Sequence, residues 1–369
     1  MMNRPDPAAL LQGPLGSWLD QQAVVRDQAR VEANERLYKA ALFGGVPAAF
    51  LMFLLPWPVD FKIMVLVFAG GAAWAWSQVP KRKAVKAVKV GINQAIAEAL
   101  GLEYSHDVTR KGGFNFAKTY RLLPGFDRAS FEDQWCGLTM GHDFCLHEAH
   151  LEERQGSGKN SRWVTVYRGA IMTLGCSRRF HGITVVQRHG VHKKLLGGTK
   201  DSIRLAGQDL GYCNVVHPGF EDVFDIFSTD PVEARYLVHP AYVEKMLELE
   251  RAYNGQDVRC LFIEGQVVVT LKTRELFESG SIDAGEDRQR LATTIEQFGK
   301  LADLAGALNE WDRAAKAEFA ARASQDDGSA RKDSADFIAG AAAIAQVAEA
   351  APQALGFGRK PGGFGRKGM

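Results

Sequence analysis

The densest group of side chains able to bind a metal or move a proton is the segment Gly141–His150, GHDFCLHEAH. Alternation along a β-strand would place Cys145 and His147 on one face and Glu148 and His150 on the other. One metal site could not collect all of them, and structural zinc sites draw paired ligands from two elements, which the sequence does not offer. We therefore expect ordinary strand residues here and no metal ligands.

Other patterns with catalytic precedent are incomplete. Gly156–Ser161, GSGKNS, resembles a phosphate loop, but Glu153 stands where the first glycine belongs and Asn160 where a magnesium ligand belongs. We interpret this segment as a hairpin loop. Cys176 and His181 are close in sequence, which alone does not define a nucleophile and its base. No GxSxG, HExxH or GxGxxG motif occurs.

Asp230 and Glu233 could act as paired carboxylates, yet they also fit the start of a helix. Asp230 is a capping residue, Pro231 would occupy the first turn, and Glu233 stands three positions after the cap. We favour the helix start over the acid–base pair. The basic loop at residues 189–194 is interpreted as solvated. The catalytic residues therefore remain unknown, and we expect no metal and no other cofactor.

The chain that carries these side chains has two strongly hydrophobic stretches near its N-terminus. Ala40–Trp57 and Ile63–Pro80 are each eighteen residues long and uncharged. At 1.5 Å per residue each would span roughly 27 Å, enough for the hydrocarbon core of a bilayer. Pro56 and Pro58 favour a tight turn between them. The alternative is a buried helical pair in a soluble protein; the flanking charges and tryptophans favour a transmembrane hairpin.

Basic residues predict the orientation of this hairpin. The short connection holds only Lys62, whereas nine basic residues flank the two spans: Arg26, Arg30, Arg36, Lys39, Lys81, Arg82, Lys83, Lys86 and Lys89. The positive-inside rule therefore predicts a multi-pass protein of the inner (cytoplasmic) membrane with both termini in the cytoplasm. We interpret the scattered cysteines as reduced thiols, which suits that compartment: Cys136, Cys145, Cys176, Cys213 and Cys260.

The region from residue 101 to residue 279 changes to period two and short apolar runs. Strands are expected at Gly137–Glu153, Arg162–Gly175, Gly182–Arg188, Val223–Phe227, Val258–Glu264 and Val267–Lys272. Glu264 and Gly265 favour a tight hairpin, and helices are expected to begin at Asp230 and Pro240. The fold class is therefore α+β: a two-helix transmembrane hairpin followed by a cytosolic, mainly antiparallel sheet domain with packed helices.

Five segments follow from these patterns. They are 1–39, a flexible stretch and a helix; 40–80, the transmembrane hairpin; 81–279, the cytosolic α+β domain; 280–319, an amphipathic helix; and 320–369, a disordered low-complexity basic tail. The helix just after the second span could lie on anionic headgroups or pack on the domain, and packing is favoured. The tail repeats GFGRK, and we favour solvation over contact with lipid or nucleic acid.

Several motifs together resemble a known family. They are Tyr167–Gly169, Phe180–Val186, Phe220–Phe224 and Asp230–Pro240. With the double span, they are similar to bacterial membrane proteins of the domain of unknown function 3137 family, over about Lys81–Ser281. His239 stands where similar proteins commonly have Thr. The resemblance implies a membrane-anchored protein with a cytosolic α+β domain, and it supplies no activity, cofactor or catalytic residue.

Two functions are compatible with these patterns. We favour a binding module that contacts the lipid bilayer and another envelope protein. We expect no specific nucleic-acid binding. The alternative is a membrane-anchored enzyme, hydrolytic or lipid-modifying, with its site in the sheet domain. A deep pocket that gathers His181, Arg235 and Glu148 would favour the enzyme. A homo-oligomer through Gly70 and Gly71 of the second span is a further, weaker hypothesis.

Overall fold

The structure is a computed structural model. It describes residues 4–139, 141–176, 180–192, 199–214, 220, 222–238, 240–252, 257–273, 276–301 and 303. The chain divides into two compact units, Met1–Asp312 and Arg313–Met369, and every described residue lies in the first. The tail predicted for 320–369 and the end of the amphipathic helix predicted for 280–319 lie outside the described residues. The five predicted segment boundaries stay predictions.

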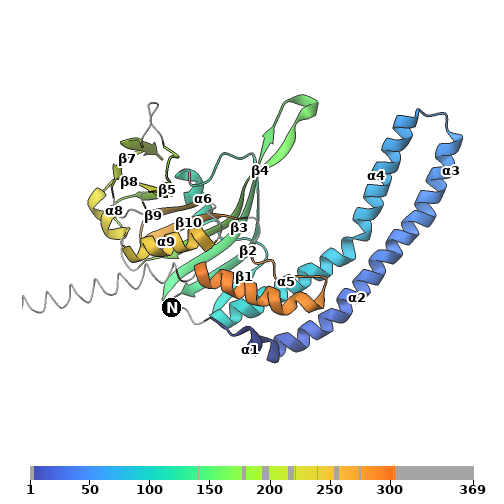
Figure 1. Cartoon of the computed structure of the whole chain (residues 1–369), viewed down its shortest axis with the longest axis horizontal. Helices are drawn as coiled ribbons and strands as arrows, with labels where there is room; N and C mark the ends of the chain where they lie inside the picture. Colours follow the sequence, from blue (N-terminus) through green and yellow to red (C-terminus); the bar gives the residue numbers. More distant parts are fainter. Residues whose placement is uncertain are drawn as a thin grey trace, which may run out of the picture. The chain divides into compact units, whose positions relative to one another are not determined.

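Long helices form the N-terminal hairpin (Figure 1). After α1 (Pro7–Gln12), α2 (Pro14–Ala40) continues through one π-helical turn, η1 (Ala41–Gly45), into α3 (Val46–Leu54). The chain turns at residues 55–58, and α4 (Val59–Ser77) is followed by α5 (Val79–Leu100). Gln78 between them keeps helical dihedral angles. Helix α2 thus continues without a break into the first apolar stretch.

Both arms of the hairpin are long and apolar enough to cross a membrane. Their most apolar stretches are almost wholly exposed, with 6 % and 0 % of the residues buried. Phe53, for example, is 86 % exposed. The core helix of a soluble protein would bury such side chains, whereas the residues that the structure describes leave these stretches uncovered.

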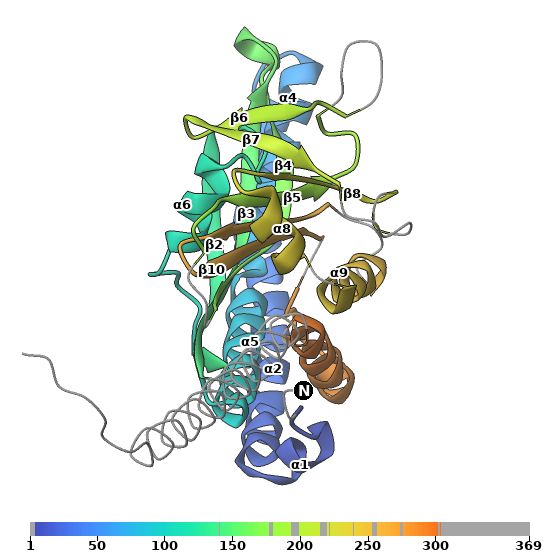
Figure 2. The same ribbon diagram turned by 90° about the vertical axis from the view of Figure 1, so that its left-hand side faces the viewer.

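A ten-stranded sheet follows, and every described strand pair in it is antiparallel (Figure 2). Its spatial order is β1-β2-β3-β4-β10-β9-β5-β8-β7-β6. The strands are β1 Leu102–Ser105, β2 Arg128–Thr139, β3 His142–Gln155, β4 Arg162–Gly175, β5 Thr184–Arg188, β6 Ser202–Leu205, β7 Gln208–Cys213, β8 Phe224–Ser228, β9 Val258–Ile263 and β10 Gln266–Lys272. The predicted α+β class is confirmed.

Turn geometry explains which strand predictions succeeded. Glu264 and Gly265 both have positive φ and join β9 to β10, as expected for a two-residue hairpin. The single strand predicted for Gly137–Glu153 is wrong. It is broken where Gly141 adopts a φ of +82°, so β2 ends at Thr139 and β3 returns beside it.

Helices cover both faces of the sheet. On one face, α5 buries Val88, Ile92 and Ile96 completely, together with Phe298 of the helix at residues 287–301. The packing interpretation of the segment after the second span is therefore confirmed. On the other face, α6 (Gly112–Thr119) contributes Phe114 to a second apolar cluster. The remaining described helices are α8 (Pro231–Leu237), α9 (Pro240–Ala252), η2 (Gly158–Asn160) and η3 (Ala284–Glu286).

The cysteine interpretation needs a correction. Cys136 of β2 and Cys145 of β3 are direct cross-strand partners and are joined in a disulfide. The sequence separates them by only nine residues, but the β2–β3 turn that brings them together was not predicted. No other disulfide joins cysteines of the described residues. The interpretation of the five cysteines as scattered thiols is therefore wrong for this pair, which β2 and β3 place within bonding distance.

Candidate functional site

The most unusual polar residue in the sheet is Asp133. It lies at an irregularity of β2, where the register to β3 shifts between Glu132 and Trp135, and its φ is +57°. Residues other than glycine seldom adopt this conformation, and bulges commonly redirect a side chain. Here the carboxylate of Asp133 is fully buried and meets α5, with Oδ2 2.6 Å from Nζ of Lys89.

Further polar groups surround this ion pair. Tyr104 donates its hydroxyl to Asp133 Oδ1 at 2.6 Å, and His106 Nδ1 lies 3.1 Å from the same oxygen. The Lys89 ammonium also reaches Glu278 Oε1 at 2.9 Å. We call these five residues the Lys89 cluster. It joins α5 to β2, to the end of β1 and to the loop after β10.

Charges in the Lys89 cluster reinforce one another. Burial disfavours the charged form of Lys89, but attraction by Asp133 and hydrogen bonds to Asp133 and Glu278 outweigh it, so the pKa of the ammonium is raised. Burial, and then the negative charge of Asp133, raise the pKa of Tyr104. Lys89 is thus charged and Tyr104 neutral at physiological pH.

Glu148 of β3 lies beside the Lys89 cluster and is only 4 % exposed. Its Oε1 has no hydrogen-bond partner among the described residues. Burial raises the pKa of Glu148 well above its ordinary value, and repulsion by Asp133 adds to the effect. Glu148 therefore holds a proton under conditions in which an exposed glutamate is ionised.

The chemistry open to this cluster is limited. The ligand atoms of His106, Glu132 and Asp133 lie within 4.8 Å of one another, a separation that a divalent cation could bridge. The Lys89 ammonium, however, already supplies a positive charge at 2.6 Å from Asp133. Because Asp133 is fully buried, its carboxylate is also closed to a substrate. We interpret the cluster as an ion-pair network that joins α5 to the sheet.

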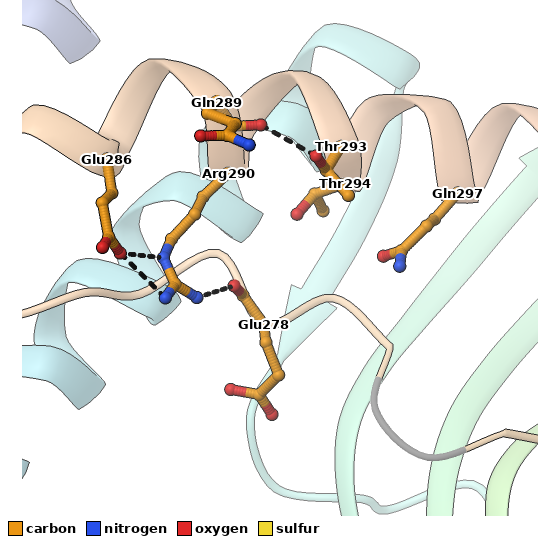
Figure 3. Close-up of a pocket in the computed structure, with 7 residues that line it drawn as sticks. All are labelled: Glu278, Glu286, Gln289, Arg290, Thr293, Thr294 and Gln297. Atoms are coloured by element: carbon orange, nitrogen blue, oxygen red, sulfur yellow. Dashed lines mark hydrogen bonds and ion pairs between the residues drawn. The ribbon is translucent and has the colours of Figure 1, made fainter.

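A hollow of about 400 Å³ lies beside this network (Figure 3). Arg290 crosses it, donating to the main-chain oxygen of Glu278 at 3.0 Å and pairing with Glu286 at 2.9 Å. The remaining lining residues are Gln289, Thr293, Thr294 and Gln297. Its lining contains neither a cysteine or serine nucleophile nor a histidine base. The hollow offers hydrogen bonds, but no catalytic set.

A second buried ion pair joins α2 to the domain. The guanidinium of Arg26 meets both carboxylate oxygens of Asp287, each at 2.7 Å, and also donates to the main-chain oxygen of Ser281 at 3.2 Å. The two side chains are 1 % and 8 % exposed. Arg26 thus ties one arm of the hairpin to the domain, as Lys89 ties the other.

The strand prediction for the 141–150 segment is confirmed within β3. His147 packs against the Phe131 ring at 5.9 Å, and burial lowers the pKa of its imidazole to about 4. Glu148 lies on the opposite face near Lys89, so the segment does divide between two faces. The loop at 156–161 connects β3 to β4, as predicted. That none of these side chains binds a metal stays a prediction.

The helix-start interpretation of Asp230 is confirmed. Its carboxylate caps α8 by accepting from the backbone N–H groups of Val232 at 2.9 Å and Glu233 at 3.1 Å. Glu233 has a different role from the one expected of a capping box. It accepts from the backbone N–H groups of His181 at 3.0 Å and Gly182 at 2.7 Å, and so holds the loop before β5.

The three residues whose meeting in one pocket would favour the enzyme lie in different places. Glu148 is on β3, whereas His181 precedes β5, four strands further along the sheet. At about 4.8 Å between neighbouring strands, that is a separation of about 19 Å. Arg235 of α8 donates to the main-chain oxygen of Asn214 at 3.4 Å. They therefore do not form one site.

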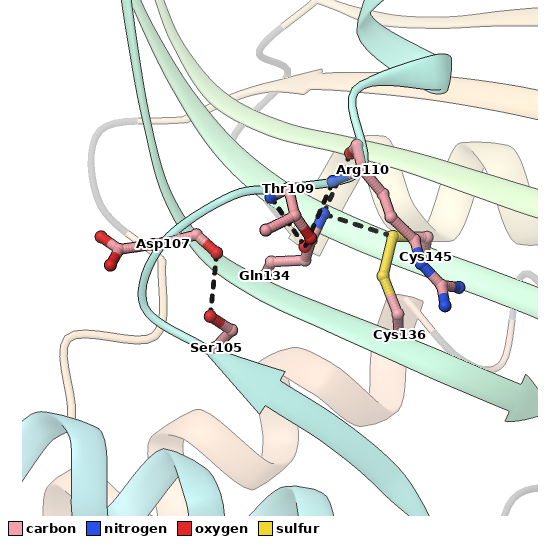
Figure 4. Close-up of a disulfide and its surroundings, with 7 residues drawn as sticks. All are labelled: Ser105, Asp107, Thr109, Arg110, Gln134, Cys136 and Cys145. Atoms are coloured by element: carbon pink, nitrogen blue, oxygen red, sulfur yellow. Dashed lines mark hydrogen bonds between the residues drawn. A yellow bond between two sulfur atoms is a disulfide. The ribbon is translucent and has the colours of Figure 1, made fainter.

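Another polar cluster surrounds the disulfide (Figure 4). The side-chain oxygen of Gln134 accepts from the backbone N–H of Thr109 at 3.1 Å and from the hydroxyl of Thr109 at 2.9 Å. The side-chain nitrogen of Gln134 donates to the main-chain oxygen of Arg110 at 2.9 Å. Gln134 thus fastens the segment before α6 to β2, next to Cys136 and Cys145. These contacts are structural.

Sequence reasoning did not find the Lys89 cluster or the Arg26–Asp287 pair. The sequence around Lys89 carries no clear signal, because its neighbours on the helix surface include Val85 and Ile92 but also Lys86 and Asn93. This setting does not distinguish Lys89 from a solvated lysine. The partner itself was hidden, because Asp133 belongs to an irregular part of β2 that was not predicted.

A family model and a solved structure are similar to parts of this chain. Residues 165–310 match the family model described as "Protein of unknown function (DUF3137)". No curated protein matches the chain. Among solved structures, the crystal structure of the mycobacterial trehalose monomycolate transport factor A, TtfA, is similar over 61 % of this chain and 96 % of that one, at 11 % identity. Its TM-score of 0.31 is too low to support any argument. The family match confirms the predicted resemblance to DUF3137, over the stretch from β4 to the helix after β10.

Proposed function

We propose that this chain is a membrane-anchored interaction module. Its helical hairpin crosses the inner membrane of a bacterium twice, both termini lie in the cytoplasm, and the sheet domain binds another envelope protein. The observation that carries the proposal is the contrast along the two arms: their apolar ends are exposed, while buried ion pairs tie their stems to the domain through Arg26 and Lys89.

Exposed aromatic residues support the membrane anchor. Phe43, Phe53 and Phe68 are each more than 70 % exposed. Burying one such side chain gains about 1.5–3 kcal/mol, so these helices need an apolar environment that the described part of the chain does not supply. Trp76, near the end of α4, lies 5.1 Å below the guanidinium of Arg36, an arrangement that suits a membrane interface.

Free positive charge at the base of the hairpin supports the orientation. The basic residues at the end of α2 each pair with an acid three or four residues earlier, as Arg36 does with Glu32. In contrast, four basic residues after α4 make no ion pair with any described residue: Lys81, Arg82, Lys83 and Lys86. The orientation rests on these residues, because the disulfide removes the argument from reduced thiols.

An interaction role is favoured over the enzyme because the polar clusters of the described residues act structurally. Asp133 is fully buried, Asp230 caps α8, and Glu233 accepts hydrogen bonds from the loop before β5. None of these carboxylates is available to a substrate. A second copy of the chain is one partner to consider, since Gly70 and Gly71 leave open space on α4.

The test is recovery of the full chain from membranes after chemical cross-linking and detergent extraction. We expect the chain in the membrane fraction, with one protein recovered in near-stoichiometric amount. Reporter fusions after residue 90 should be active only as cytoplasmic reporters. A chain found mainly in the soluble fraction would contradict the anchor, and a membrane-bound chain without a stoichiometric partner would contradict the interaction role.

A further inference from the structure

An apolar groove of about 760 Å³ runs between α2 and α5. Its floor includes Trp18 of α2, whose indole lies against Gly91 so closely that a Cβ there would come within 2.2 Å of the ring. The walls are mostly small or apolar: Pro14, Leu15, Ala87, Val90 and Ala95. The two helices therefore approach closely and leave a shallow channel along their length.

This groove lies mostly on the side of α5 away from the sheet, and Leu15, Trp18 and Ala95 of its lining also contact the core cluster. Residues three and four positions apart share a helix face. The core-facing set includes Val88, Ile92 and Ile96, whereas the groove takes Ala87, Val90 and others at the same spacing on the opposite side. A helix that already has a buried face and still carries a second apolar one is suited to another partner.

Charge gives the groove a direction. Lys83 and Lys86 line the end next to α4, and Glu98 lines the other end. Fifteen residues separate Lys83 from Glu98, about 22 Å along the helix. Neither lysine forms an ion pair with a described residue. A ligand that fills the groove therefore meets two free positive charges near the membrane and a negative charge far from it.

Two occupants fit poorly. A phospholipid whose phosphate met Lys83 or Lys86 would direct its acyl chains back into the bilayer, away from the groove beyond Ala87. A second copy related by a twofold axis along the membrane normal would point in the same direction. It would then place lysines next to lysines and Glu98 next to Glu98, and such like-charge contacts are unfavourable.

We propose that the α2–α5 groove binds an amphipathic helix of a partner protein, with acidic residues at the membrane-proximal end and a basic residue opposite Glu98. Two antiparallel helices with an apolar groove between them accept a third helix by ordinary ridge-and-groove packing. A helix of about fifteen residues would cover the groove's length. This inference rests on the proposed interaction role, and it specifies the surface and the kind of partner.

Site-specific photo-cross-linking tests the proposal in the full chain in cells. A photoreactive benzoyl-phenylalanine replaces Ala87 or Ala95 in the groove, or the exposed Ala99 outside it. We expect the two groove positions to give adducts with the same segment of one protein, several-fold above the Ala99 control. Mass spectrometry of the adduct should show an amphipathic sequence with acids at one end.

Charge reversal provides the matched control. Lys83→Glu with Lys86→Glu should reduce the adduct at least about tenfold, because like charges would then meet. Lys81→Glu with Arg82→Glu makes the same change in net charge outside the groove and should leave the adduct within about twofold. Equal losses from both pairs would mean that general attraction, rather than this groove, holds the partner, and would overturn the proposal.

The remaining outcomes separate the two hypotheses. Adducts with lipid or with a second copy of the chain, or adducts no stronger than those of Ala99, contradict the groove proposal. If a partner is nevertheless recovered with the unaltered chain, the interaction role stands and only the groove is wrong. If neither experiment gives a partner, the interaction role itself fails.

Discussion

Arg26 and Asp287 are 261 residues apart in sequence, yet their side chains form a two-pronged ion pair with both N–O distances at 2.7 Å. The planar guanidinium matches the carboxylate geometry, and a third hydrogen bond, to Ser281, satisfies a further donor. Because the pair is almost fully buried, its loss would leave one charge without a partner. It is therefore a sensitive probe of how α2 is attached.

Arg26→Ala should destabilise the folded domain strongly. Removing one partner of a buried ion pair typically costs about 3–5 kcal/mol, because the remaining charge, here Asp287, stays buried. Denaturant unfolding of the detergent-solubilised chain, followed by near-ultraviolet circular dichroism, measures the loss. Arg30→Ala is the control: Arg30 pairs with Asp27 on the surface of α2, and such pairs contribute at most about 1 kcal/mol. Equal effects of the two variants would contradict the structure.

Glu148→Gln should change how stability depends on pH. The pKa of Glu148 is raised in the folded chain, so folding favours its protonated form. The stabilisation that Glu148 gains from its raised pKa is therefore fully present below pH 4.5, the ordinary pKa of a glutamate. It is lost as the pH rises toward the pKa of the folded state. The groups that face it are Asp133 and Glu132 of β2, Lys89 of α5 and Glu278 of the loop after β10.

Thermal unfolding between pH 5 and pH 8 checks this prediction. Gln cannot ionise, so Glu148→Gln should raise the midpoint more at pH 8 than at pH 5, relative to the unaltered chain. Glu153→Gln, on the exposed part of β3, is the control and should leave the pH dependence unchanged. A midpoint gain that is the same at both pH values would show that Glu148 is not held in its protonated form.

Gly91→Ala should separate α2 from α5 locally. A Cβ at residue 91 would lie 2.2 Å from the Trp18 ring, and overpacking of this kind costs about 1–3 kcal/mol. Gly70→Ala is the control, since nothing lies within 4 Å of a Cβ there. Trp18→Leu should recover part of the stability lost in Gly91→Ala, which thermal unfolding of the single and double variants measures. Additive losses would contradict the contact.

Features set by local sequence were predictable. The hairpin follows from two long uncharged runs, the β9–β10 turn from Glu264-Gly265, and the start of α8 from Asp230 and Pro231. The irregularity at Asp133 was not predictable. A residue other than glycine that adopts a positive φ cannot be recognised from its type. The irregularity also breaks the alternation of apolar and polar residues by which a strand is recognised.

The clusters depend on tertiary contacts. Lys89 meets an aspartate 44 residues away on a strand that was not predicted, and Arg26 meets a residue near the opposite end of the described chain. Charged residues on α2 and α5 look alike in sequence whether they face solvent or a buried carboxylate. Only the packing of α5 on the sheet distinguishes Lys89 from Lys86.

The thiol state of Cys136 and Cys145 in cells tests which side of the membrane holds the sheet domain. The two sulfurs are close enough to bond, and the compartment decides whether they remain bonded. In the cytoplasm, where we propose that this domain lies, glutathione and thioredoxin keep thiols reduced. Acid-quenched cells, denatured and treated with a maleimide of known mass, should therefore yield chains that carry five labels. Three labels, rising to five only after reduction, would place the domain in an oxidising compartment and reverse the proposed orientation.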